Sequence, residues 1–103
     1  MKDKKKDTSL AKKDEKSLTN VNYQRDRLFK KGINLMADEK LEEAVVYFQQ
    51  ALRIDPENVE TLLKLGYAKF HLDDYGEALR VYDQILEIDI TNPEVWNLRG
   101  LVH

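Results

Sequence analysis

The chain has 103 residues, of which 42% are hydrophobic and 35% charged, and its formal net charge at pH 7 is −2. It contains no cysteine, which excludes disulfide bonds, and no apolar run approaches the roughly 18 residues that a membrane-spanning helix needs. The composition is typical of a small soluble domain, for which we expect a cytoplasmic location.

Residues 1–20 differ in charge from the rest of the chain. They contain seven lysines and four acidic residues, net +3, whereas residues 21–103 contain ten basic and fifteen acidic residues, net −5. The leading segment has little apolar surface to bury, so we expect it to be disordered. Contact of its lysines with anionic lipid or nucleic acid is an alternative, but the interleaved acids weaken the positive field. We expect no nucleic-acid partner and no membrane span.

Beyond this segment, apolar residues recur every three or four positions, which predicts helices. Pro56 ends the second of them, and Asn58 and Asn92 are placed to accept from the first free amides of the helices that follow. Asp74 with Glu77 predicts a variant of the capping box at the start of the fourth. The expected helices cover residues 22–37, 41–54, 59–71, 75–88 and 93 to the end.

The sequence repeats itself at an interval of 34 residues. Gly32, Gly66 and Gly100 stand at this spacing, in units that cover 25–58, 59–92 and, in part, 93–103. Glycine inside a helix costs about 1 kcal/mol relative to alanine, so its recurrence predicts points where two helices approach closely. Other residues that recur in register are Leu28, Leu62 and Trp96, then Ala44 and Ala78, then Phe48 and Tyr82.

This pattern resembles the tetratricopeptide repeat, whose units of 34 residues carry a large residue, a small residue, an alanine, an aromatic residue and a proline at fixed positions. The resemblance covers residues 25–103; Lys31 and Arg99 depart from it where the family has leucine, and Ile90 where it has proline. It implies an all-α fold of about five helices, in which antiparallel helix-turn-helix units stack into a right-handed superhelix. The repeat domain is expected to cover residues 21–103.

A unit of this size cannot bury its own apolar face, and the stack leaves a concave surface that usually binds another polypeptide. The resemblance implies that the first helix of each unit lines this surface. The groove so predicted is apolar with an acidic edge, so we expect a protein-binding adaptor for an apolar or amphipathic peptide with basic flanks. Its residues are Asp26, Phe29, Ile33, Met36, Ala37, Glu60, Leu63, Tyr67, Phe70, His71, Glu94, Asn97 and Leu101.

One subclass of the family binds the C-terminal carboxylate of heat-shock chaperones through a clamp of lysine, arginine and asparagine side chains. The positions that match this clamp are Phe29, Ile33, Lys64, Glu94 and Leu98. Only Lys64 could hold a carboxylate and Glu94 would repel it, so the sequence disfavours a ligand of this kind.

Two alternatives stay open. In the first alternative, the apolar part of the groove binds no partner protein and packs instead against the chain's own Val21 and Tyr23, or against further repeats. The sequence stops within a first helix, so we expect a fragment of a longer array in which Trp96, Leu98 and Leu101 have lost part of their covering. Self-association through this helix would make the chain a structural scaffold.

Catalytic candidates are few. Both serines lie within the first twenty residues, and His71 and His103 are far apart, so a nucleophile with its base cannot be assembled. His71 with Asp73 and Asp74 would be a poor metal site, because zinc sites draw on three or four spaced ligands. We expect no enzymatic activity, no cofactor and no metal.

Overall fold

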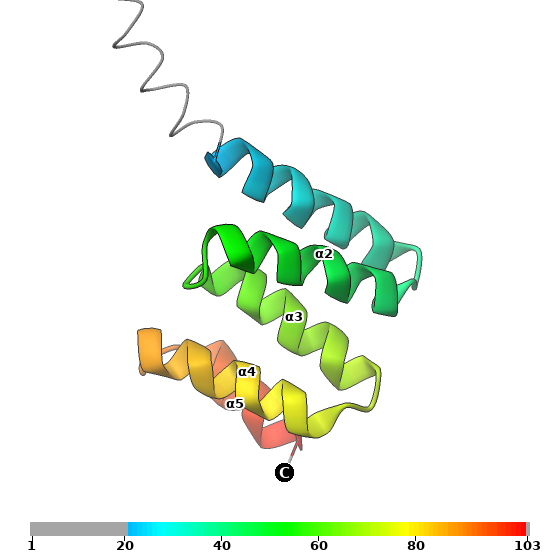
Figure 1. Cartoon of the computed structure of the whole chain (residues 1–103). Coiled ribbons are helices and arrows are strands. Elements are labelled where there is room, and N and C mark those ends of the chain that lie inside the picture. Colours follow the sequence, from blue (N-terminus) through cyan, green and yellow to red (C-terminus); the bar gives the residue numbers. More distant parts are fainter. Residues whose placement is uncertain (1–20, 103) are drawn as a thin grey trace, which may run out of the picture.

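The computed structural model describes residues 21–102. Consecutive helices are joined by short turns and stack in chain order (Figure 1). The predicted all-α repeat fold is confirmed, with the expected bounds for the second to fourth helices; the predicted disorder of residues 1–20 lies outside the described residues. Residues 21–37 are helical, and they are followed by α2 (Leu41–Ile54), α3 (Val59–His71), α4 (Tyr75–Ile88) and α5 (Pro93–Val102).

The turn inside each of the first two units contains a residue in the left-handed conformation. These residues are Glu39, with φ of 62°, and Asp73, with φ of 64°. In the first turn the amide of Lys40 donates to the carbonyl of Leu35 at 2.8 Å. In the second turn the equivalent amide of Asp74 donates to the carbonyl of Lys69 at 2.9 Å. Such bonds satisfy carbonyls that a helix end leaves free. The two hairpins therefore turn in the same way.

The capping box predicted at Asp74 and Glu77 is wrong. The Asp74 carboxylate accepts no bond from the amides of α4 and lies 3.6 Å from Lys69 Nζ. The Asp74 amide already donates to the Lys69 carbonyl, so it is not free for Glu77, whose carboxylate lies 3.2 Å from Arg80 Nε. The left-handed turn at Asp73 has used the donor that the capping box needs.

Asn58 and Asn92 cap α3 and α5, as predicted. Asn58 Oδ1 accepts from the Thr61 amide at 2.9 Å and from the Thr61 hydroxyl at 2.8 Å. Asn92 Oδ1 accepts from the Val95 amide at 3.1 Å. Thr61 and Val95 are both buried, so each cap fixes the start of a helix where it packs on the preceding hairpin.

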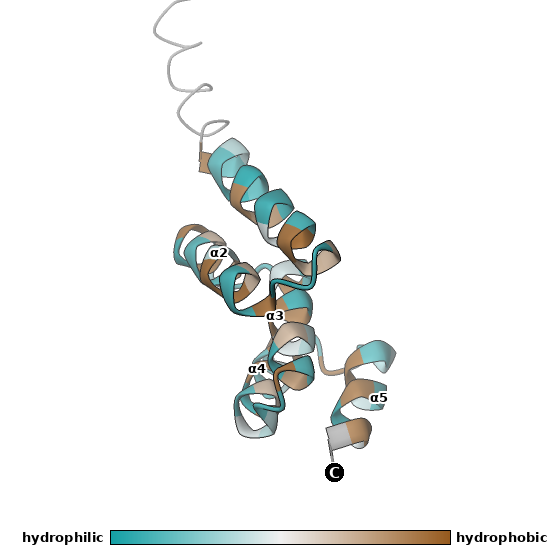
Figure 2. Ribbon diagram, turned by 90° about the vertical axis from the view of Figure 1, so that its right-hand side faces the viewer, coloured by the Kyte–Doolittle hydropathy of each residue, from teal (hydrophilic) through white to brown (hydrophobic). Residues whose placement is uncertain are grey.

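The core lies between the helices, whose hydrophobic and hydrophilic residues alternate around each helix (Figure 2). Phe48 and Tyr82 have no exposed surface, and each packs on a glycine. A Cβ on Gly32 would lie 2.5 Å from Phe48 Cε1, and one on Gly66 would lie 2.9 Å from Tyr82 Cδ1. The predicted close approaches are therefore confirmed. Other core residues are Ala44, Val45, Ala51, Leu62, Leu65, Ala68, Ala78, Val81, Ile85 and Val95.

The side of α5 that carries the third glycine is open. No described atom lies within 4 Å of a Cβ built on Gly100. Trp96 is 47% exposed, whereas Leu62, which stands at the same place in the second unit, is 3% exposed. The α5 end of the stack thus presents apolar surface to solvent.

The Tyr82 hydroxyl is buried and has no hydrogen-bond partner among the described residues. Burial, together with the nearby Tyr67 and Glu94, raises the pKa of Tyr82 to about 12. A buried hydroxyl without a partner costs about 1 to 3 kcal/mol. The first hairpin avoids this cost, since Phe48 fills the equivalent place.

We therefore expect Tyr82→Phe to raise the free energy of unfolding by about 1 kcal/mol. The parent should also lose stability as the pH rises from about 10 to about 12, because tyrosine in the unfolded chain titrates near 10 and the folded protein holds this proton longer. Below the unfolded pKa this contribution is fully present. Urea denaturation across this pH range checks both points, and an equal pH dependence of parent and variant would contradict them.

Candidate functional site

A hollow of about 490 Å³ opens between the first helix, α3 and α5. These are the first helices of the three units, which the resemblance to the repeat predicts to line the concave side. It is lined by Met36 from the first helix, by Glu60, Leu63, Lys64 and Tyr67 from α3, and by Glu94 and Leu98 from α5.

The lining combines apolar side chains with carboxylates. Tyr67 is 43% exposed, and its ring centroid lies 4.3 Å from that of His71, which is also exposed. Glu60 and Glu94 belong to the first turns of α3 and α5, and Lys64 is the one basic residue of the lining. The hollow therefore carries a small net negative charge beside apolar surface.

The exposed apolar patch is smaller than the sequence predicted. Phe29, Ile33 and Phe70 are half-buried and pack against the core. The ring centroid of Phe29 lies 5.8 Å from that of Phe48, and the ring centroid of Phe70 lies 5.4 Å from that of Tyr75. The rings of Phe29 and Phe70 therefore pack against α2 and α4, the second helices of their units.

Five further predicted groove residues lie outside the hollow: Asp26, Ala37, His71, Asn97 and Leu101. Asp26 is exposed and accepts from Arg25 Nη2 at 3.0 Å, so its charge is already paired. Ala37, Asn97 and Leu101 are exposed as well. The hollow thus brings together Met36, Glu60, Leu63, Tyr67 and Glu94 of the predicted set.

Arg25 links the start of the repeat domain to the end of α2. Its Nη1 donates to Asp55 Oδ2 at 2.8 Å. This hydrogen bond, followed by the one to Asp26, raises the pKa of Arg25 above its ordinary value. The ion pair joins the first helix to the residue that follows α2.

Lys64 and Leu98 line the hollow although the sequence did not predict either of them as a groove residue. Both stand at the sixth position of their unit, one residue beyond the predicted groove position. In a helix of 3.6 residues per turn, the sixth position lies at the edge of the face that carries the fifth. This adjacency is the sequence signal by which Lys64 and Leu98 could have been predicted.

The alternative in which the chain's own leading residues cover the groove finds no support in the described part of the chain. Val21 is 48% exposed and Tyr23 57% exposed. Tyr23 instead lies beside Arg27, whose guanidinium carbon is 5.8 Å from the ring centroid.

Within residues 21–102, no three His, Cys, Asp or Glu side chains are grouped so that they could hold a metal ion. No helix in the same range is long and apolar enough to cross a membrane.

The chain is similar to known proteins over most of its length. It is 32% identical over 85 residues, 74% of this chain, to anaphase-promoting complex subunit 3 of Schizosaccharomyces pombe, and it spans only 13% of that protein's length. A solved structure described as the first TPR of Spaghetti (RPAP3) bound to an HSP90 peptide aligns with 78% of this chain and 90% of its own, at a TM-score of 0.42 and 18% identity. Residues 35–102 match the family model described as tetratricopeptide repeat. Because that match covers well over half of the sequence, the chain belongs to the tetratricopeptide repeat family.

Proposed function

We propose that the chain is a protein-interaction module whose groove binds a peptide segment with apolar side chains and at least one basic side chain. The observation that carries this proposal is the hollow between the first helix, α3 and α5, where apolar side chains and two carboxylates share one lining. Absence of catalysis and a location in the cytoplasm, both expected from the sequence, are part of the same proposal.

The apolar side chains of the hollow favour apolar ligand residues. Met36, Leu63 and Leu98 are partly buried on the core and still line the hollow. Full burial of an aliphatic ligand side chain stabilises a complex by about 1.5 to 3 kcal/mol before the cost of association is subtracted. Two such side chains contribute about 3 to 6 kcal/mol, which is comparable to the cost of association, so further contacts must add to them.

The charges of the hollow favour a basic ligand residue. Glu60 and Glu94 outnumber Lys64, so a lysine or arginine of the ligand can form charge-assisted hydrogen bonds there. An acidic ligand tail would face two carboxylates and one ammonium group. The ligand is therefore of a different class from the acidic chaperone tails that one subclass of the family binds.

Selection from a phage library of random peptides tests the proposal, followed by affinity measurements on the enriched sequences. We expect enrichment of lysine or arginine next to apolar residues. The triple variant Glu60→Gln, Tyr67→Ala and Glu94→Gln should bind the selected peptides at least about tenfold more weakly, a loss of about 1.4 kcal/mol. A matched control is Glu57→Gln with Glu87→Gln, which removes two exposed acids outside the hollow.

Equal weakening by both sets of substitutions would reduce the effect to general electrostatics and contradict the groove as the site. Enrichment of acidic peptides would contradict the proposed ligand class. Circular dichroism of each variant establishes that the fold is retained.

A second candidate function, self-association as a structural scaffold, is favoured by the apolar surface at the α5 end. Ile90 and Leu101 are each 69% exposed, and Trp96 is 47% exposed. Light scattering should then show a mass that rises with protein concentration and falls when Trp96→Ser and Leu101→Ser are introduced. A constant monomer mass from micromolar to millimolar protein would remove this candidate.

A further inference from the structure

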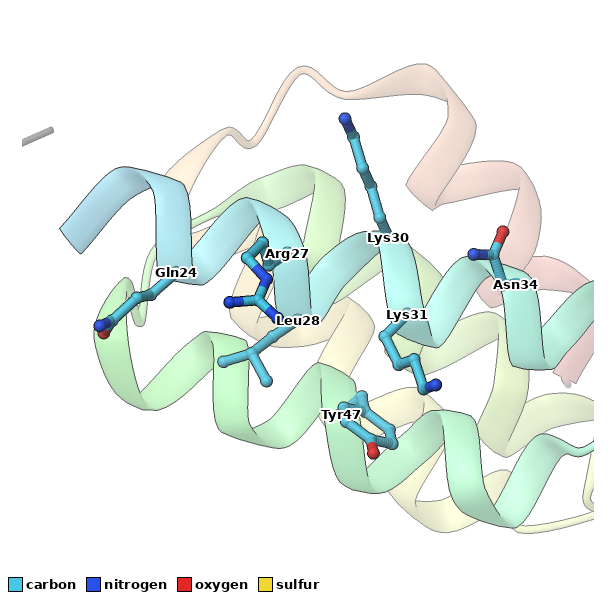
Figure 3. A pocket seen from close by; sticks show the side chains of 7 residues that line it. All are labelled: Gln24, Arg27, Leu28, Lys30, Lys31, Asn34 and Tyr47. Atoms are coloured by element: carbon cyan, nitrogen blue, oxygen red, sulfur yellow. The ribbon is translucent and has the colours of Figure 1, made fainter. Parts of the chain in front are cut away.

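We propose that the outer face of the first helix is a second docking surface, which binds an acidic amphipathic helix of a partner protein. This proposal does not depend on the function of the groove. The surface, here called the basic face, is a hollow of about 700 Å³ shown in Figure 3. It is lined by Gln24, Arg27, Leu28, Lys30, Lys31, Asn34 and Tyr47.

In the second and third units, the side of the first helix that corresponds to the basic face is covered by another helix. The residues 34 positions after Arg27, Lys31 and Asn34 are Thr61, Leu65 and Ala68. Those three are 1%, 6% and 0% exposed, and the next equivalent of Thr61, which is Val95, is 0% exposed. In the first unit the same positions are exposed. The geometry of the repeat thus leaves a helix-sized place on this face.

A helix that presents only apolar side chains to this face is a poor occupant. Covering Arg27 and Lys31 with the apolar face of a repeat helix would take two charges out of water, which is costly unless they are paired. Residues 1–20 are unsuitable too, because their net charge of +3 has the same sign as the basic face. The occupant must bring carboxylates.

In the third unit, the residue equivalent to Lys31 is basic and is covered by a helix that supplies a carboxylate. Arg99 stands two repeat lengths after Lys31, and its Nε donates at 2.8 Å to Oδ1 of Asp83, on the preceding helix α4. A basic residue at this position therefore pairs with a carboxylate from the helix that covers it. Lys31 occupies the equivalent place with no described helix over it, so a covering helix with an acid at the matching point would satisfy it.

Charge along the chain favours an acidic partner at this end. Residues 21–37 contain four basic residues and one acidic residue, net +3, whereas residues 38–103 contain six basic and fourteen acidic residues, net −8. The positive field is thus concentrated around the basic face and steers acidic segments toward it. A nucleic acid would be repelled by the remaining two thirds of the chain, which disfavours a polyphosphate as the occupant.

The floor of the basic face suits an amphipathic helix. Leu28 and Tyr47 lie in the hollow, and Figure 3 shows Lys31 reaching toward Tyr47 while Lys30 points away from it. An adjoining hollow of about 350 Å³ shares Lys31 and Tyr47 and adds Leu35, Val46, which is 48% exposed, and one acid, Glu43. Apolar side chains of a docked helix would cover this floor while its acids meet the basic rim.

The test is fluorescence anisotropy with a labelled synthetic peptide of about 18 residues, long enough to form a helix, that carries leucines on one face and glutamates and aspartates on the other. The full chain should bind it saturably, and more weakly as the salt concentration rises. Arg27→Glu with Lys31→Glu should weaken binding at least about tenfold. A peptide of the same pattern with lysines in place of the acids should bind this variant better than it binds the parent.

The matched control is Lys40→Glu with Arg53→Glu. Both residues are exposed and outside the basic face, and the pair changes the net charge by the same amount, so binding should change by less than about twofold. The groove variant with Glu60→Gln, Tyr67→Ala and Glu94→Gln should bind the acidic peptide as the parent does, which separates this surface from the groove.

Absence of saturable binding to the parent would overturn the proposal, and so would equal weakening by the two charge-reversal pairs. Tighter binding of single-stranded oligothymidylate or of phosphatidylserine vesicles than of the acidic peptide, lost with Arg27→Glu and Lys31→Glu, would replace the peptide by a phosphate ligand. Circular dichroism and thermal melting of every variant keep a folding defect from being read as a binding defect.

Discussion

Replacement of Asn58 by alanine is expected to lower the free energy of unfolding by about 3 kcal/mol. Loss of an N-cap side chain costs about 1 kcal/mol. Asn58 Oδ1 also accepts from the hydroxyl of Thr61, which is only 1% exposed, and a buried hydroxyl left without its partner costs about 1 to 3 kcal/mol more. Urea denaturation of parent and variant measures the difference.

The third unit provides the control for this prediction. Asn92 caps α5 in the same way, but its Oδ1 accepts from the amide of Val95, a residue with no hydroxyl to lose its partner. Asn92→Ala should therefore cost only about 1 kcal/mol. In the Asn58→Ala background, Thr61→Val should recover about 2 kcal/mol, because it removes the orphaned hydroxyl. Equal losses for Asn58→Ala and Asn92→Ala would show that the Thr61 hydroxyl contributes nothing.

The second large effect is expected at Gly66. Alanine at this position places its Cβ 2.9 Å from Cδ1 of Tyr82 and closer still to Cε1. The Tyr82 ring is fully buried and cannot move aside without disturbing α4. Overpacking of this kind costs about 1 to 3 kcal/mol or somewhat more and exceeds the roughly 1 kcal/mol that alanine gains over glycine in a helix. We expect a net loss of about 2 kcal/mol by urea denaturation.

Gly100→Ala is the matched control, since Gly100 holds the same place in its unit and nothing described lies within 4 Å of the added methyl group. This substitution should leave stability unchanged or raise it by up to about 1 kcal/mol. Leucine in place of Tyr82 should reduce the cost of Gly66→Ala, because the ring that collides is gone. A stability of the Gly66→Ala variant at or above that of the parent would show that the two helices separate easily at this point.

The helices themselves follow from local sequence. The expected bounds of α2, α3 and α4 are the observed ones, because apolar periodicity, Pro56, Asn58 and Asn92 act within a few residues. The recurrence of Gly32 and Gly66 also anticipated which points of the helices touch. Each of these signals is carried by neighbours in the chain or by the repeat interval.

Some local patterns are compatible with two different outcomes. Asp74 and Glu77 have the spacing of a capping box, yet the left-handed Asp73 closes the turn through the Asp74 amide and leaves Glu77 no donor. Phe29 has the spacing of a groove residue, yet its ring packs 5.8 Å from that of Phe48. In each case one backbone donor or one neighbouring helix decided between two locally equivalent outcomes.

The basic face is a surface that the sequence alone did not predict. Lys31 was noted only as a departure from the leucine expected at that position, and a departure in sequence does not say which surface it lies on. That surface is indicated by the buried Leu65, 34 residues after Lys31, and by the 2.8 Å pair of Asp83 with Arg99, which stands two repeat lengths after Lys31.

For this protein, the sequence by itself determined the helices, the interval at which they recur, the caps at Asn58 and Asn92 and the glycines that let helices approach. These depend on backbone geometry and on interactions over a few residues. Only the tertiary structure decided which side chains line the hollow and, within residues 21–102, that the Tyr82 hydroxyl is buried without a partner and that no helix covers the basic face. Those features depend on how neighbouring helices cross, which sets whether a residue at the edge of a helix face meets the core, a partner or water.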